Sequence, residues 1–214
     1  ENASAMKTVT FETDSQLDII GDSAFSDAEA LSRIVIPESV TSIGDYAFSD
    51  AEALTSIVIP ESVASIDYGA FGSVDSLTIY AEASEESDDW TDNWNSDNRP
   101  VEWGITDYGT KDDLDYVVTE EEKVTIIGQT AIGDATDLSI PDTIDNKEVT
   151  TIGAGGFQNN NTLDTIFIPL SITTIDKDAF KDSDLDTIYV EAYRKPDDWD
   201  DDWNPDSIDV DWNH

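Results

Sequence analysis

Residues 54–71 read LTSIVIPESVASIDYGAF, and this stretch is one copy of a unit that recurs along the chain. Isoleucine stands at positions 20, 43 and 66, with a constant spacing of 23 residues. The same spacing separates a series of phenylalanines, which are Phe25, Phe48 and Phe71 and, later in the chain, Phe157 and Phe180. A fixed period of this length predicts a repeat protein in which each unit stacks on the next one.

The apolar residues within the unit predict its local structure. Leu54, Ile57 and Ile59 follow the spacing L-x-x-L-x-L, and residues 57–59 alternate inward, outward and inward as a short strand does. Pro60 lacks a backbone donor and ends the strand. One unit of 23 residues cannot bury its own apolar side chains, whereas stacked units bury them in a continuous core. We therefore predict a leucine-rich-repeat solenoid, with short strands on one face and turns or irregular segments on the other.

The pattern occurs twice. Repeats stop at the acidic, Trp-rich residues 83–103 and resume with two β-branched runs, 116–119 and 123–127, which we expect to form a hairpin. A second Trp-rich tail follows, and many residues of the first half recur 109 positions later, among them Phe48, Ile66, Phe71, Trp90, Trp94 and Trp103 as Phe157, Ile175, Phe180, Trp199, Trp203 and Trp212. The duplication predicts two tandem segments, 7–104 and 105–214, each closed by its own cap.

Composition restricts the classes of partner. The 214 residues include 49 Asp and Glu but only 10 Lys and Arg, which gives a formal net charge of −39. Such a surface repels phosphate backbones and anionic lipids, so we expect neither nucleic acid nor a membrane as partner. A solvated acidic exterior, adaptation to salt and capture of cations all remain open, and composition alone favours the first.

The sequence is also informative through what it lacks. It contains no cysteine, so no disulfide can form, and no apolar run approaches the roughly 20 residues needed to span a bilayer. From Met6 the chain enters the array within a repeat and without a polar capping segment, so we expect further repeats before it in a longer protein. The start of the chain therefore says little about targeting.

The unit I-P-E-S-V-x-S-I-x-x-x-A-F, with Pro37, Pro60 and Pro169 after the strand, resembles the BspA-like leucine-rich repeat of bacterial surface proteins. The tails, W-x-x-x-W-N followed by V-x-W, resemble the segment that closes such arrays. The resemblance implies a secreted or cell-wall protein that adheres to host proteins or other cells, and it implies no catalytic residues. The chain differs from the usual repeat in its acidity and in lacking a cysteine after the phenylalanine.

The residues offer little support for catalysis. The single histidine, His214, is the last residue and is expected to be mobile, which excludes Ser–His and Cys–His nucleophile systems. With 49 acidic residues, carboxylate pairs arise by chance, and no spacing singles out one pair as a glycosidase would require. We therefore predict that the chain is not an enzyme and has no cofactor.

The second tail approximates a calcium-binding loop. Its oxygen-bearing residues fall at the ligand positions of the twelve-residue template, and these are Asp198, Asp200, Asp202, Asn204, Asp206 and Asp209. Trp203, however, occupies the position that requires glycine, and Asp209 replaces the preferred bidentate glutamate. We therefore expect a solvated acidic loop and no specific metal site.

The tryptophans have two possible roles. Trp90 and Trp94, like Trp199 and Trp203, are spaced to share one face of a helical turn. They could form a platform on which a sugar ring stacks, or a cap whose indoles cover the open end of the last coil. We predict the cap, because the end of a solenoid must be covered and nothing else nearby is large and apolar.

The remaining candidate site is a row of residues that face outward from the strands. These residues are Thr10, Val35, Val58 and Tyr80 in the first segment, and Ser139, Phe167 and Tyr189 in the second. Stacked strands lie about 4.8 Å apart, so we expect one continuous stripe along a concave sheet, each aromatic residue more exposed than its inward neighbour. The predicted ligand-binding residues are its apolar members: Val35, Val58, Tyr80, Phe167 and Tyr189.

The stripe leads to two functional hypotheses. The first is an extracellular, cell-surface adhesion module that binds a protein or glycan partner. The second is a non-catalytic structural spacer in a larger surface protein, because β-branched and aromatic residues favour strands whether or not they bind anything.

Overall fold

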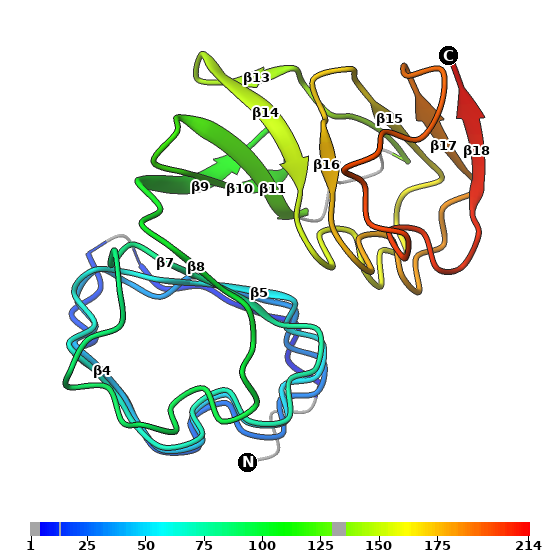
Figure 1. Cartoon of the computed structure of the whole chain (residues 1–214). Helices are drawn as coiled ribbons and strands as arrows, with labels where there is room; N and C mark the ends of the chain where they lie inside the picture. The colour runs from blue at the N-terminus through cyan, green and yellow to red at the C-terminus, as the bar shows by residue number, and fades with distance from the viewer. Residues whose placement is uncertain (1–4, 13, 130–135) are drawn as a thin grey trace. The chain divides into compact units, whose positions relative to one another are not determined.

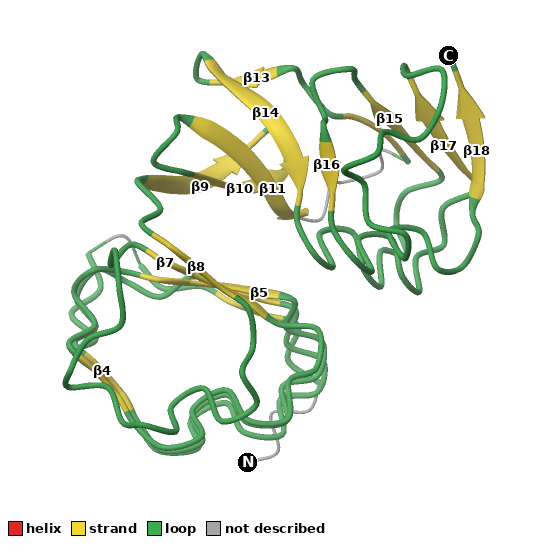
Figure 2. Ribbon diagram, viewed as in Figure 1, coloured by secondary structure: helices red, strands yellow, loops and turns green. Residues whose placement is uncertain are grey.

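The computed structural model describes residues 5–12, 14–129 and 136–214, which pack into two compact units, Glu1–Ile105 (unit 1) and Thr106–His214 (unit 2) (Figure 1). The described residues form strands, turns and loops but no helix (Figure 2). The described residues therefore contain no helix that is long and apolar enough to span a bilayer. The division of the chain into the domains 7–104 and 105–214, each closed by its own cap, stays a prediction.

Unit 1 is a stack of coils that carries parallel strands on separate faces. One sheet has the order β2-β4-β6, another has the order β5-β7-β8, and β1 pairs with β3. The strand bounds are β1 Thr8–Val9, β2 Ile19–Ile20, β3 Arg33–Ile34, β4 Ser42–Ile43, β5 Ser56–Ile59, β6 Ser65–Ile66, β7 Thr78–Ala81 and β8 Val101–Trp103. In Figure 1 these coils appear as closed loops laid one on another.

The register of unit 1 confirms the predicted solenoid. Ile20 pairs with Ile43, and Ile43 pairs with Ile66, so each isoleucine lies on its own equivalent in the next coil. The rings of Phe25, Phe48 and Phe71 stack with centroids 5.2 and 5.5 Å apart. Backbone hydrogen bonds join the coils outside the strands as well, for example from the Phe48 N–H to the Ala70 carbonyl at 2.8 Å.

Unit 2 begins with an antiparallel sheet and continues as a solenoid. The predicted hairpin is confirmed: β10 (Leu114–Val118) pairs with β11 (Lys123–Gln129), and β9 (Asp107–Lys111) extends it. β11 then runs parallel to β14 (Lys147–Ile152), whose other contacts are with β13 (Thr143–Ile144) and β16 (Thr174–Ile175).

The second sheet of unit 2 is parallel throughout, with the order β12-β15-β17-β18. Its strands are β12 Asp137–Ser139, β15 Thr165–Ile168, β17 Thr187–Val190 and β18 Asp209–Trp212. Ile166 and Ile188 are completely buried on its inner side. In the same core, the rings of Phe157 and Phe180 stack with centroids 5.4 Å apart, as the phenylalanines of unit 1 do.

The Trp-rich tails are caps, as predicted. In unit 1, the buried indoles of Trp90 and Trp94 lie 4.8 Å apart, and the rings of Trp94 and Phe71 form a T-shaped pair with planes at 83°. In unit 2, Trp199 and Trp203 are 5.0 Å apart, and Trp203 and Phe180 form the same T-shaped pair, also at 83°. The segments that carry them are turns rather than the helical turn expected from the spacing. Each cap therefore continues the aromatic column of its own unit, leaving these four indoles buried.

Candidate functional site

In unit 2 the outward-facing residues lie side by side as the sequence predicts. Ser139, Phe167, Tyr189 and Asp211 are in register across β12, β15, β17 and β18. Phe167 and Tyr189 are half-buried, whereas their inward neighbours in the strands are completely buried, in agreement with the predicted order of exposure. Two aromatic side chains therefore stand together at the outer side of the sheet.

His214 lies against these two rings. Its imidazole centroid is 4.2 Å from that of Tyr189 and 6.3 Å from that of Phe167. Its backbone N–H donates to the Val190 carbonyl at 3.2 Å, and its Nδ1 lies 3.4 Å from an Asp211 carboxylate oxygen. The structure thus places this histidine, which the sequence predicts to be mobile, beside the sheet. We call Phe167, Tyr189 and His214 the aromatic face.

In unit 1 the predicted stripe is not continuously exposed. Val35 is 38% exposed, but Val58 is only 8% and Tyr80 only 4% exposed. Val58 and Tyr80 are paired in register, and every residue of β7 is buried on both sides of the sheet. The alternation of side chains predicts which side of a strand a residue occupies but not what packs against that side. This is why Val58 and Tyr80 are buried although the sequence predicts them to be exposed. A ligand-binding role for the five predicted residues stays a prediction.

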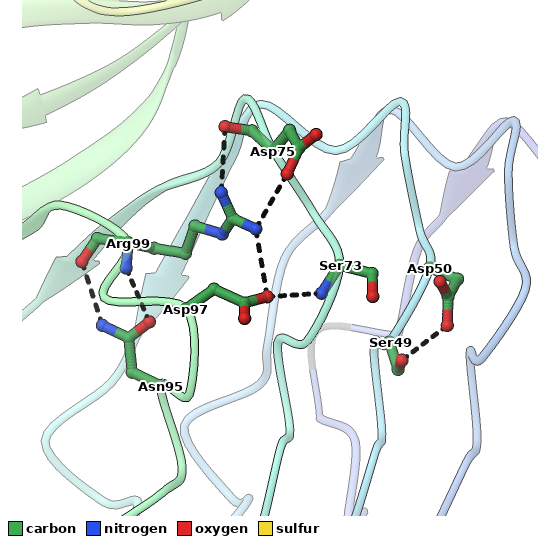
Figure 3. Close-up of polar contacts among 7 residues, drawn as sticks. All are labelled: Ser49, Asp50, Ser73, Asp75, Asn95, Asp97 and Arg99. Carbon is green, nitrogen blue, oxygen red and sulfur yellow. Dashed lines mark hydrogen bonds and ion pairs between the residues drawn. The ribbon is translucent and has the colours of Figure 1, made fainter.

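A polar cluster at the end of unit 1 centres on Arg99, whose role is not apparent from the repeat pattern of the sequence (Figure 3). Its Nη2 donates to Asp75 Oδ1 at 3.0 Å and to Asp97 Oδ2 at 3.1 Å, and its side chain is 13% exposed. The Asn95 amide brackets the Arg99 backbone, accepting from its N–H at 2.8 Å and donating to its carbonyl at 2.9 Å. Arg99 is the one basic residue in the acidic tail 83–103, and this isolated positive charge is the sequence signal that could have indicated the cluster.

Asp97 joins this cluster to the preceding coil. Its Oδ2 accepts the Ser73 N–H at 2.7 Å. That backbone hydrogen bond is the main reason why the Asp97 pKa lies below the ordinary 3.8, and the hydrogen bond and charge of Arg99 lower it further against an opposing effect of desolvation. The contact between coils is therefore strongest while this carboxylate is ionised.

Replacing Asp97 with asparagine removes the charge that strengthens its bonds to the Ser73 N–H and to Arg99, so the protein is expected to be less stable at neutral pH. The loss should be only about 1 kcal/mol, because a partly exposed ion pair is screened by solvent. A lowered native pKa stabilises the fold above the ordinary value of 3.8, and that contribution is lost as pH falls through the lowered pKa. The difference between wild type and variant should therefore vanish in strong acid. Urea unfolding at several pH values measures it, and the control is Asp92→Asn, which removes the same charge from an exposed position of the same tail. A difference that persists unchanged in strong acid would contradict the role of the Asp97 charge.

The acidic tail of unit 2 makes similar contacts, with Ile208 at the position equivalent to Arg99. Asn204 brackets the backbone of Ile208 with two hydrogen bonds of 3.0 Å, and an Asp206 carboxylate oxygen accepts the Asp182 N–H. Asp200 accepts the N–H of a residue two positions later, Asp202. Three residues of the calcium-loop-like segment therefore bind backbone N–H groups. Within the described part of the chain, no group of three or more acidic, His or Cys side chains is arranged to hold a metal ion.

The large excess of acidic residues predicts a salt-dependent stability. Raising NaCl from 0.01 to 0.1 M shortens the Debye length from about 30 to about 10 Å, which screens repulsion across a chain of formal charge −39. The melting temperature should therefore rise with NaCl, as measured by circular dichroism. A flat response would contradict this expectation, and a rise caused by micromolar Ca²⁺ alone would instead indicate a specific metal site.

Comparison with known proteins agrees with this architecture. Residues 1–85 and 113–195 match the family model described as BspA type Leucine rich repeat region, in six copies. No curated protein matches the chain. Solved structures are also similar to the chain, and two of them are described here. A leucine rich cell surface protein from Faecalibacterium prausnitzii has 20% identity and a TM-score of 0.43, with 94% of this chain and 65% of that one covered.

A leucine-rich repeat protein from Eubacterium ventriosum has 19% identity and a TM-score of 0.33, with 82% of this chain and 59% of that one covered. The chain thus spans less than two thirds of either of these two proteins. The family model covers most of the chain and describes a repeat, and the coils, the phenylalanine columns and the register follow that repeat. The chain belongs to the family of BspA-type leucine-rich repeat proteins.

Proposed function

We propose that this chain is a non-catalytic, extracellular binding module of a bacterial surface protein, which contacts a protein or glycan partner through the aromatic face of unit 2. The observation that carries the proposal is the half-buried pair Phe167 and Tyr189, which stand in register at the outer side of the sheet. Large aromatic side chains dominate the binding energy of many protein interfaces, because they bury much apolar area with little loss of conformational freedom.

The surroundings of the aromatic face are polar, as the rim of a binding surface usually is. Ser139 and Asp211 are exposed at its two edges. Two residues before Phe167 and Tyr189, Thr165 and Thr187 pair across the same two strands. An apolar or planar group of the partner would cover the rings, and a donor would pair with Asp211. Of the ligand-binding residues predicted in unit 1, Val35 is exposed, while Val58 and Tyr80 would have to be uncovered before they could touch a ligand.

A second candidate is a structural spacer that holds other domains away from the cell. The burial of Val58 and Tyr80 favours this alternative, because those side chains then contribute to packing instead of to a free surface. A spacer requires no exposed aromatic pair, so substitution of Phe167 and Tyr189 separates the two candidates.

The test is to apply the full chain to a glycan array and to a panel of purified host matrix proteins. We expect the wild type to bind at least one of these ligands and the Phe167→Ser, Tyr189→Ser double variant to bind at least about tenfold more weakly, as loss of interface hot spots predicts. Tyr193→Ser, at an 84% exposed position outside the strands, is the matched control and should bind like wild type.

Equal melting temperatures of the wild type and both variants would show that any loss of binding is local. Binding that survives the double substitution would contradict the proposed site. The absence of any ligand for the wild type would favour the spacer.

A further inference from the structure

Two tyrosines on the turns of unit 1 form an exposed pair that the proposed function does not use. Tyr46 is 45% and Tyr68 is 46% exposed. Their ring centroids are 5.4 Å apart and their planes meet at 71°, so one ring presents its edge to the other. We call these two residues the tyrosine pair. They lie in a different unit from the aromatic face.

The backbone at Tyr46 is strained. Its φ is 55°, in the left-handed region, where a bulky side chain is uncommon and costs free energy. The equivalent positions of the neighbouring coils are Ser23 and Gly69, which adopt the same conformation with a small side chain or none. Among the described residues with positive φ, Tyr46 is the one aromatic residue. Because its ring is half exposed, core packing does not account for a tyrosine at this position.

The next coil makes room for the Tyr46 ring. A Cβ atom at Gly69 would lie only 2.9 Å from Tyr46 Cε1, so the ring rests against the bare Gly69 backbone. The Tyr46 N–H donates to the Tyr68 carbonyl at 3.0 Å, and the Tyr68 N–H donates to Asp45 Oδ1 at 2.9 Å. The tyrosine pair is therefore held in place by three successive contacts between two coils.

The charge around the tyrosine pair is negative. The pKa of Tyr46 is raised above its ordinary 10.0 by desolvation and then by the charges of Tyr68 and Asp45. The Asp45 carboxylate lies beside the pair, and the Asp45 N–H itself donates to the carboxylate of Asp22 at 3.1 Å. Only three of the ten basic residues of the chain belong to unit 1, and one of them, Arg99, is bound to two carboxylates elsewhere.

We propose that the tyrosine pair and Asp45 together bind a cationic side chain, arginine or lysine, in a basic segment of a partner protein. The face of a tyrosine ring attracts a cation placed within about 6 Å of its centroid. The neighbouring carboxylate pairs with the same cation, and the net charge of −39 draws a basic partner toward the surface. Arginine suits the site better than lysine, because its planar guanidinium stacks on the ring while it bonds the carboxylate.

This inference is independent of the aromatic face, and its test uses different variants. The probe is a short peptide that alternates arginine with glycine, titrated into the full chain in about 0.15 M NaCl, where the Debye length is about 8 Å. Its neutral control is the same peptide with citrulline in place of arginine. We expect the arginine peptide to bind and the citrulline peptide to bind at least about tenfold more weakly, since citrulline keeps the shape but loses the charge.

The variants separate the tyrosine pair from the general field of the protein. Tyr46→Gly should weaken binding by about threefold or more while it raises the melting temperature, because glycine relieves the strain at a left-handed position. Tyr46→Phe keeps the ring and should retain the binding. Asp45→Asn should weaken binding more than Glu29→Gln, which removes the same unit of charge from an exposed position in another turn.

Two results would overturn the proposal. If Tyr46→Gly binds the peptide as tightly as wild type, the attraction is a diffuse effect of net charge. If the citrulline peptide binds equally well, or a neutral oligosaccharide binds and loses affinity in Tyr46→Gly, the pair is a stacking platform for uncharged ligands and not a cation site.

Discussion

Replacing Trp199 with alanine is expected to lower the free energy of unfolding of unit 2 by about 3–5 kcal/mol, the range for truncation of a buried aromatic side chain. The indole is buried and touches two other rings, with centroids 5.0 Å from Trp203 and 5.8 Å from Trp212. Its Nε1 has no hydrogen-bond partner among the described residues, so the loss arises from packing and from the cavity opened above the last coil.

Urea unfolding of the full chain, followed by circular dichroism, measures the effect. Tyr193→Ala is the control, because a side chain that is 84% exposed should change stability by less than about 0.5 kcal/mol. Trp90→Ala makes the same test in unit 1, where the indole in addition donates a hydrogen bond to the Val63 carbonyl at 3.3 Å. A Trp199 variant as stable as wild type would contradict the role of this residue as a cap.

Replacing Phe48 with alanine is expected to destabilise unit 1 by a similar amount, about 3–5 kcal/mol. Phe48 is the middle ring of three, stacked on Phe25 at 5.2 Å and on Phe71 at 5.5 Å, and it is completely buried. Alanine at this position interrupts the column, so both neighbouring rings lose a contact. The measurement is again urea unfolding of the full chain.

Phe25→Ala is the matched comparison for Phe48→Ala. Phe25 is only partly buried, and among the described residues its ring stacks on Phe48 alone, so its truncation should cost clearly less. Phe48→Leu keeps most of the apolar volume and should cost less than Phe48→Ala. Equal losses for Phe25→Ala and Phe48→Ala would show that the column does not act as a continuous core.

The sequence by itself determines the coils, their stacking and their closure. Residues with the same place in the period become partners in space, so the spacing of Ile43 and Ile66 predicts the pairing that the structure has. The duplication predicts in the same way that Trp199 and Trp203 repeat the contact of Trp90 and Trp94. In a solenoid, residues one period apart in the sequence lie in contact in adjacent coils, so these contacts can be predicted from the sequence alone.

The tertiary structure decides what lies on the outer surface of the coils. The period places Val58 and Tyr80 on the outward side of their strands, but only the packing shows that both are buried. It also brings His214 onto Tyr189 and links Arg99 to two carboxylates. These contacts involve side chains that do not recur from coil to coil.

The strained turn at Tyr46 is likewise decided by the tertiary structure and not by the repeat. Serine, tyrosine and glycine follow one another at the equivalent position of successive coils, and only the fold shows that all three share a left-handed backbone. Outside the repeated core each side chain packs on whatever its own neighbours provide, so its environment depends on three-dimensional contacts that a period cannot express.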